Sequence, residues 1–323
     1  MSKHVSFSLK AIAGAALIVA AGSAMAAAEF GANIELDNTS RSGSAVAAGS
    51  DGLSQNGRVE VGVSAKVGAD AFVAGRTSFL TQKGGTLATD DMWVQLGNKS
   101  GDVKLGRFEG ADLFPLISDT LVNHAGSVYG TNTLRGRMGS EVFHAAGTLN
   151  LGGSNSLEIG YIDGTKNSVA AVGAKGLRAV ASFGAGALSA RVGVESGEYA
   201  PIGAAPANKV QGWGLTATYD AGSFKLTGNY SNGKQDAAAN NNKSAYALSV
   251  GVGAFGAGYV AATNDQAGGD VKVNTAYAAY SIPLFGLKGA SVTPAISSST
   301  AKDSVTGAST SENAVRVRLN YAF

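Results

Sequence analysis

Apolar and polar residues alternate with a period of two along almost the whole chain. Residues 58–67, 188–195 and 224–231 show the pattern most clearly, and in the first of these every second residue is apolar: Val59, Val61, Val63, Ala65 and Val67. Because consecutive side chains of a β-strand point to opposite faces, each segment has one apolar face and one polar face. The alternation therefore predicts strands that meet an apolar environment on one side and water on the other.

The pattern and its breaks predict sixteen strands, and short connections alternate with long ones. The expected strands are residues 29–37, 57–67, 70–80, 89–97, 102–108, 134–148, 156–163, 176–184, 186–196, 209–220, 223–232, 244–253, 255–264, 271–283, 288–299 and 313–323. Short turns at one end and long loops at the other are typical of bacterial outer-membrane barrels, whereas a soluble β-sandwich has no reason to sort its loops in this way. We therefore predict one all-β domain, a transmembrane antiparallel up-and-down β-barrel of about 16 strands at residues 27–323, which is wide enough for an aqueous lumen.

Composition agrees with this fold. Charged residues make up 15% of the chain, against about 25% in ordinary soluble domains. The five prolines are few, as expected where every strand must donate its backbone hydrogen bonds. The chain has no cysteine, which excludes a disulfide scaffold, a thiol nucleophile and cysteine ligation of a metal.

The N-terminal segment has the three parts of a secretory signal peptide. Lys3 and Lys10 come before an apolar run at residues 11–21, and Ala24 and Ala26 provide the small residues of a cleavage site. A buried helix or a membrane anchor is the alternative, but the run is shorter than the roughly 20 residues of a membrane span. We predict that residues 1–26 are a cleaved signal peptide; the remaining chain then has 23 basic and 23 acidic residues, which gives no reason to expect nucleic acid as a partner.

The last predicted strand alternates up to the final residue. Val315, Val317 and Leu319 share one face with Tyr321 and Phe323. An alternating final strand with a C-terminal aromatic residue resembles the signal read by the outer-membrane assembly machinery. Tyr321 and Phe323 are therefore candidates for an assembly signal, and an ordinary edge strand is the alternative.

Two consecutive strands resemble those before the third loop of general bacterial porins, especially the beta-proteobacterial ones. Residues 91–97 (DMWVQLG) match an aromatic-Val-x-Leu strand, and residues 100–107 (SGDVKLGR) match the next strand, which ends in Leu-Gly-Arg. With residues 29–37 and the terminal Asn-Tyr-Ala-Phe, the resemblance covers the chain after residue 26. It implies a trimeric barrel of sixteen strands whose long third loop folds into the lumen; residues 108–133 match this loop. The amino-terminal strand departs from the commonest opening, which keeps a solute-specific, carbohydrate-selective porin as an alternative.

Selectivity in such a pore depends on charge at the narrowest point. The predicted third loop has three acids, Glu109, Asp112 and Asp119, and no Lys or Arg. We expect it to face a basic wall and to create a transverse field that mildly favours anions. Basic candidates for the constriction are Arg58, Arg76, Arg107, Arg135 and Arg137; by strand phase, Lys66, Arg178, Arg191, Lys225, Arg316 and Arg318 also face the lumen.

The strand register is open at two places. Arg107 shares its phase with apolar residues and needs a break at Gly106 to reach the pore, and the register near residues 140–142 is unassigned. Acids that face the lumen are expected to be fewer than the basic residues. The expected acids are Glu35, Glu60, Glu158 and Glu195.

Several aromatic residues are candidates for girdles at the membrane interfaces, although they could also be lipid-facing without that role. They are Trp93, Trp213, Tyr219, Tyr230, Tyr259, Tyr277 and Tyr321.

Motifs for catalysis or cofactor binding are not convincing. Residues 251–256 match G-x-G-x-x-G, but here the string reads as strand, turn and strand, without the helix of a dinucleotide site. The three histidines are scattered and there is no G-x-S-x-G motif, so we predict neither a metal site nor an enzyme nor a cofactor. The sequence predicts a porin in the outer membrane of a Gram-negative bacterium, whose partners are lipid, small hydrophilic solutes and ions; a non-conducting structural or adhesive barrel is the alternative from another class.

Overall fold

The computed structural model describes residues 28–46, 51–117, 131–138, 142–164, 173–200, 208–236, 241–266 and 269–323. The predicted signal peptide, Asp119 and residues 139–141 lie outside the described residues. No helix in the described part of the chain is long and apolar enough to cross a membrane.

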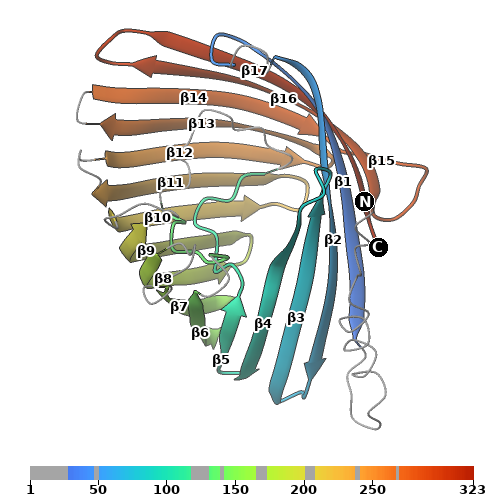
Figure 1. Cartoon of the computed structure of the whole chain (residues 1–323). Coiled ribbons are helices and arrows are strands. Elements are labelled where there is room, and N and C mark those ends of the chain that lie inside the picture. Colours follow the sequence, from blue (N-terminus) through green and yellow to red (C-terminus); the bar gives the residue numbers. More distant parts are fainter. Residues whose placement is uncertain are drawn as a thin grey trace, which may run out of the picture.

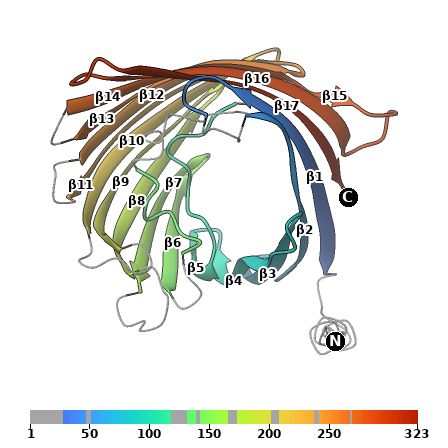
Figure 2. The ribbon, with the colours of Figure 1, turned by 45° about the horizontal axis from the view of Figure 1, so that its top comes forward.

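The described chain forms a single antiparallel sheet that closes on itself, with each strand paired to its neighbours in sequence (Figures 1 and 2). The strands are β1 (Glu29–Ser42), β2 (Gly52–Val67), β3 (Ala71–Gln82), β4 (Leu87–Asn98), β5 (Gly101–Arg107), β6 (Phe143–Gly152), β7 (Asn155–Asp163), β8 (Gly173–Ala185), β9 (Leu188–Ala200), β10 (Asn208–Asp220), β11 (Lys225–Asp236), β12 (Asn241–Val252), β13 (Phe255–Gln266), β14 (Gly269–Tyr280), β15 (Ile282–Pro283), β16 (Ala290–Asp303) and β17 (Ser309–Ala322). The two-residue β15 continues β14 in the same register along β16. The barrel thus has sixteen spanning strands, and the predicted fold class is confirmed.

The two ends of the sheet close the barrel. β1 pairs with β2 on one side and with β17 on the other. The final residue takes part, because the N–H of Ala32 donates to the carbonyl of Phe323 at 2.8 Å and the N–H of Phe323 donates to the carbonyl of Ala32 at 3.0 Å. Backbone pairing therefore extends to the end of the chain, as a barrel in lipid requires.

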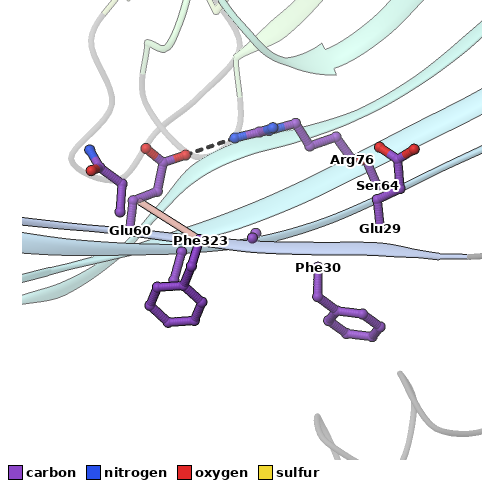
Figure 3. Close-up of a pocket in the computed structure, with 10 residues that line it drawn as sticks. Glu29, Phe30, Glu60, Ser64, Arg76 and Phe323 are labelled. Atoms are coloured by element: carbon purple, nitrogen blue, oxygen red, sulfur yellow. Dashed lines mark hydrogen bonds and ion pairs between the residues drawn. The ribbon is translucent and has the colours of Figure 1, made fainter. Parts of the chain in front are cut away.

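Large apolar side chains cover the outside of the barrel. Leu248 is 56% exposed and Phe30 is 67% exposed, as are many of their outward-facing neighbours. In Figure 3, Phe30 and Phe323 point to one side of the wall while Glu60 and Arg76 point to the other. An apolar exterior and a polar interior are the arrangement that the alternation predicted for a barrel in lipid.

Two of the predicted girdle residues are on the wrong face. Trp93 lies opposite Arg76 in the β3–β4 ladder and faces inward with it, and Tyr277 is buried against the inner wall. Some aromatic side chains lie on the inner face of the barrel. A rule that places every apolar residue outside and every polar residue inside therefore assigns Trp93 and Tyr277 to the wrong face.

The strands extend further towards the long-loop end than predicted. β2 begins at Gly52 rather than residue 57, and β16 ends at Asp303 rather than residue 299. Polar residues continue the hydrogen-bonded ladder beyond the apolar band, where hydrophobic alternation no longer marks a strand. The prediction for residues 134–148 was wrong in the opposite sense: β6 is Phe143–Gly152, and residues 134–138 belong to the preceding loop.

Candidate pore-lining site

The connection between β5 and β6 is the predicted third loop, and its described limbs are residues 108–117 and 131–138. Gly106 has φ 121, a conformation that side chains disfavour, but the ladder with β4 continues through it in one register, and Arg107 stays in phase with Val103 and Leu105. The break expected at Gly106 is therefore not seen in the strand register. Arg107 donates to the carbonyls of Thr89 and Asp90, both at 3.0 Å. Arg107 also donates to the carbonyls of Arg137 (2.8 Å) and Met138 on the return limb, so its guanidinium joins the limb to the end of β4.

The outgoing limb lies against the inner wall. The N–H of Ala111 donates to Glu158 of β7 at 2.9 Å, and Thr216 of β10 donates to the carbonyl of Leu113 at 2.9 Å. Asn229 of β11 donates to the carbonyl of Pro115 at 2.7 Å. Side chains of the wall therefore satisfy backbone groups that have no partner in a ladder.

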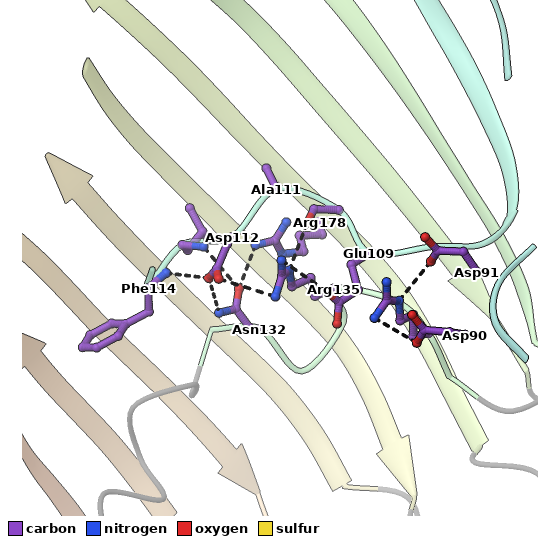
Figure 4. A network of polar contacts seen from close by, with 12 residues as sticks. Asp90, Asp91, Glu109, Ala111, Asp112, Phe114, Asn132, Arg135 and Arg178 are labelled. Atoms are coloured by element: carbon purple, nitrogen blue, oxygen red, sulfur yellow. Dashed lines mark hydrogen bonds and ion pairs between the residues drawn. The ribbon is translucent and has the colours of Figure 1, made fainter. Parts of the chain in front are cut away.

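Phe114 inserts into an apolar patch on the same wall. Its ring is fully buried and points away from the polar contacts of the limb in Figure 4. The patch comes from β12, β13 and β14 and consists of Ala245, Ala247, Val260, Ala262, Val273 and Tyr277. The outgoing limb is thus held by both hydrogen bonds and apolar packing.

The return limb is bound by one buried carboxylate. Glu195 of β9 accepts hydrogen bonds from the N–H groups of Thr133 and Leu134, both at 3.0 Å. Arg178 of β8 lies 3.7 Å from this carboxylate, and the two side chains are 3% and 1% exposed. Arg178 also donates to Asn132 at 3.1 Å, so the buried pair connects the wall to the limb.

Arg135 lies among the predicted loop acids. Its guanidinium is 3.3 Å from Glu109 and 3.5 Å from Asp112, and it donates to the carbonyl of Gly110 at 2.9 Å. Figure 4 shows these side chains gathered between the two limbs. The structure therefore brings Glu109, Asp112 and Arg135 together within the loop.

A second cluster of charges forms around Arg137, beside the paired strands β3 and β4. The register between these two strands shifts between Thr77 and Phe79. This bulge lets Asp90 and Asp91 both approach Arg137, each at 3.0 Å. Arg76 lies 3.3 Å from Asp91 and donates to Glu60 at 2.8 Å. Bulges redirect side chains in this way.

Arg137 is held in place by these acids. Its φ of 51 is in the left-handed region, which non-glycine residues adopt at a cost. Burial lowers the pKa of Arg137, but the hydrogen bond to Asp91 and the charges of Asp91, Glu109 and Asp90 outweigh it, and the net direction is upward. The guanidinium therefore stays charged.

The sequence interpretation missed Asp90 and Asp91. Two adjacent aspartates inside a predicted strand cannot both face water in a regular strand, and this conflict was the available signal.

A third cluster lies on the wall formed by β17, β1 and β2. Arg58 donates to Glu35 at 2.7 Å, and Arg318 forms a two-point contact with Asp37 at 2.7 and 2.8 Å. Arg316 lies 3.9 Å from Asp37. Two-point contacts between guanidinium and carboxylate are strong and directional, so the arginines of this wall are fixed in position.

In several of these pairs the guanidinium is the more exposed partner. The Arg58 side chain is 46% exposed and that of Glu35 is 10% exposed. The pairs Arg41–Glu312, Arg76–Asp91 and Arg318–Glu35 show the same order. Around the loop the order can be reversed, because Glu109 is 36% exposed and Arg135 is 26% exposed; Arg316 is also less exposed than Asp37.

The inner side carries acids beyond the four that were expected. Asp37, Asp90, Asp91 and Glu312 also lie on the inner side, each in an ion pair with an arginine. Strand phase misses the two aspartates of the bulge, and it gives no information about pairing. The charge of the wall therefore depends on which partner of each pair meets water.

The site consists of water-accessible charges on a barrel wall. In the described part of the chain, no group of three or more His, Asp or Glu residues is placed to hold a metal ion.

Comparison with known proteins agrees with this geometry. The family model for Gram-negative porins matches residues 13–323, and the chain belongs to this family. It is a general outer-membrane porin, a non-enzymatic channel for passive diffusion. None of the curated proteins compared with it matches.

Solved structures share the fold at low sequence identity. The anion-selective porin of Comamonas acidovorans superposes with a TM-score of 0.67 at 17% identity, covering 92% of this chain and 100% of that one. The outer-membrane channel DcaP of Acinetobacter baumannii gives 0.69 at 15% identity, covering 92% and 97%. OmpT of Vibrio cholerae in its trimer form gives 0.67 at 10% identity, covering 93% and 100%.

Proposed function

We propose that the loop between β5 and β6 narrows the lumen and that small hydrophilic solutes pass between it and the wall of β17, β1, β2 and β3. The contacts of the described limbs with β7 to β14 support this path, since they hold the loop on one side. In Figure 2, β1 and β2 lie on the side of the barrel opposite β7 to β10. The constriction would include Glu109, Asp112 and Arg135 of the loop, together with Arg58, Arg76, Arg107 and Arg137; Asp119 belongs to the same proposal.

The proposed channel mildly prefers anions. The observation that carries this proposal is that the side chains of Arg58, Arg76 and Arg318 are more exposed than the carboxylates with which they pair, Glu35 and Asp91. A solute passing the wall meets guanidinium groups, whereas on the loop side it meets Glu109. This arrangement creates the transverse field that orients dipolar solutes, and charge at a constriction governs which ions pass.

Reversal potentials across a planar bilayer with a salt gradient test this proposal. Arg58→Gln, Arg135→Ala and Arg137→Ala should each shift the potential towards cation preference, because each removes one positive charge and keeps the carboxylates beside it. Lys225→Gln is a control, since Lys225 pairs with Asp220 at the end of its strand, where both side chains are half exposed. Unchanged selectivity in all three arginine variants would contradict the proposed constriction.

We infer further that the porin is of the beta-proteobacterial type and assembles as a homotrimer, that residues 1–26 are a cleaved signal peptide and that residues 27–323 form the mature barrel. The porin-like strands at residues 91–97 and 100–107 and the basic, apolar and small-residue order of the N-terminus support these inferences. Native mass spectrometry of protein extracted from outer membranes tests the trimer and the cleavage: the expected mass is three chains that begin at Ala27, and single chains or an intact N-terminus would contradict them.

A further inference from the structure

We propose that the inner wall of β2 to β5 carries a binding subsite for aromatic carboxylates, built by Lys66, Phe72, Trp93, Gln95 and Lys104. The subsite adjoins the cluster that contains Arg76, which lies opposite Trp93, but none of its own five residues forms an ion pair of that cluster. It rests on the chain's function as an open porin, because solutes reach this wall only through the lumen.

The strand register brings these residues together. Lys66 is opposite Ala74, Ala74 is opposite Gln95, and Gln95 is opposite Lys104, so one row across four strands reads Lys, Ala, Gln, Lys. The adjacent row contains Trp93, and the row on the other side contains Phe72. Since opposite residues in an antiparallel pair share a face, two rings flank two ammonium groups and an amide on the inner wall.

The wall is hollowed at this place. A cavity of about 570 Å³ is lined by Lys66, Phe72, Ala74, Trp93 and Gln95, together with Glu29 and Ser64. This volume is within the usual range for small-molecule sites, roughly 300–1,000 Å³. Its floor is made of small residues; a Cβ at Gly97 would lie 2.8 Å from Cζ of Phe72, so the glycine lets the ring lie flat over the wall.

The lysines keep their charge available. Nζ of Lys66 lies 4.0 Å from the centre of the Phe72 ring, and Nζ of Lys104 lies 4.6 Å from that of Trp93. Within the described residues neither ammonium forms an ion pair with a carboxylate, in contrast to the arginines of the clusters. Rings attract cations and position them without neutralising them, so both lysines can receive an anionic group from the lumen.

The combination of groups selects the ligand class. Trp93 and Phe72 are half-buried and open to the lumen, and a flat apolar ring would remove water from them. A carboxylate on that ring would meet Lys66 or Lys104, while the amide of Gln95 can donate to its second oxygen. A neutral sugar would leave the ammonium groups unused, and an inorganic anion would leave the rings unused.

Tryptophan fluorescence gives a direct test. The chain has two tryptophans, and Trp213 faces outward, so Trp213→Phe leaves Trp93 as the only reporter. Titration of this variant, folded in detergent, with benzoate should give a saturable change in emission. Acetate, which lacks the ring, and glucose, which lacks the charge, should give none at the same concentrations.

Lysine variants in this background assign the binding. Lys66→Gln and Lys104→Gln should each weaken benzoate binding about threefold to tenfold, as expected for loss of one charge-assisted contact. Lys243→Gln is the matched control, because Lys243 is in phase with the inward-facing Ala245 and Ala247 but lies on β12, away from the subsite. Its titration should coincide with that of the parent.

Three results would overturn the proposal. The first is the lack of a saturable benzoate signal, and the second is lysine variants that titrate like Lys243→Gln. The third is a glucose signal that is unaffected by the lysine variants, which would assign the cavity to sugars. Potassium chloride conductance, measured on the same protein, tests the channel function separately from the binding subsite. A normal benzoate titration in a protein that does not conduct would contradict the channel function and support the subsite.

Discussion

Glu195 illustrates how single side chains hold the pore loop. Its carboxylate is nearly inaccessible to water, lies beside Arg178 and accepts hydrogen bonds from two consecutive backbone N–H groups of the return limb. Buried charges need partners of this kind, because desolvation without compensation is costly. One wall residue thus fixes the limb that carries Arg135 and Arg137.

Glu195→Ala should destabilise the folded barrel. The change removes the nearest carboxylate of the buried Arg178, which keeps Glu158 and Asn132 as neighbours, and it removes the acceptor of two N–H groups of the return limb. Breaking a buried pair typically costs about 3–5 kcal/mol. The temperature at which the detergent-folded protein loses its compact mobility on gels should fall. Glu198→Ala, at an exposed position on the same strand, should leave it unchanged, and equal midpoints for both variants would contradict this role.

The sequence predicted several residues of the site but not their pairing. Glu109, Asp112 and Arg135 could be placed in or beside the loop, because the loop is the longest break in the alternation. Asp90 and Asp91 were missed, since a bulge changes the phase of a strand and only the adjacency of the two aspartates pointed to it. The contact of Arg135 with the loop acids, rather than with a separate wall, depends on the fold of the loop itself.

At the scale of elements, the strands were predictable and their ends were not. Every predicted strand overlaps an observed one, because lipid outside and water inside impose a period of two. Beyond the lipid both faces are wet and the alternation fades, which explains the longer strands at the loop end. The predicted strand at residues 134–148 began too early because Arg135 and Arg137 alternate with other residues as in a strand. In the structure these two arginines belong to the loop, where Arg135 pairs with Glu109 and Arg137 pairs with Asp91 of β4.

Phe114 supplies the apolar anchor of the outgoing limb, beside its hydrogen bonds to the wall. Phe114→Ala should loosen it, since removal of a fully buried phenylalanine typically costs about 3–5 kcal/mol, here in local attachment of the loop to the wall. We expect an open channel with larger current noise and more frequent transient closures in single-channel recordings.

Phe183→Ala, which removes a lipid-facing ring of β8, is the control for this variant and should record like the parent. Noise and closures that match the parent in Phe114→Ala would show that the ring does not anchor the loop.

At the scale of the whole molecule, closure of the sheet is what makes a channel possible. The ladder between β1 and β17 leaves no open edge, so backbone polar groups do not face lipid. Phe323 contributes both a backbone pair with Ala32 and a ring on the outer surface, 67% exposed.

Phe323→Ala tests the predicted assembly signal formed with Tyr321. The variant keeps the backbone pair but loses the terminal ring, and we expect a lower yield of folded barrel in the outer membrane of expressing cells, measured by its heat-modifiable gel mobility. Phe30→Ala removes an equally exposed ring near Phe323 without altering the terminus. Similar yields for both variants would show that outer-surface packing, and not a terminal signal, explains any loss.

The barrel of this porin must enclose continuous water across about 30 Å of hydrocarbon. Reconstitution of the purified protein into a planar lipid bilayer measures this water path. We expect stepwise increases in conductance, with current proportional to voltage at low voltage and rising with salt concentration. Protein that inserts into the bilayer, shown by its protection from protease, but passes no current would contradict it.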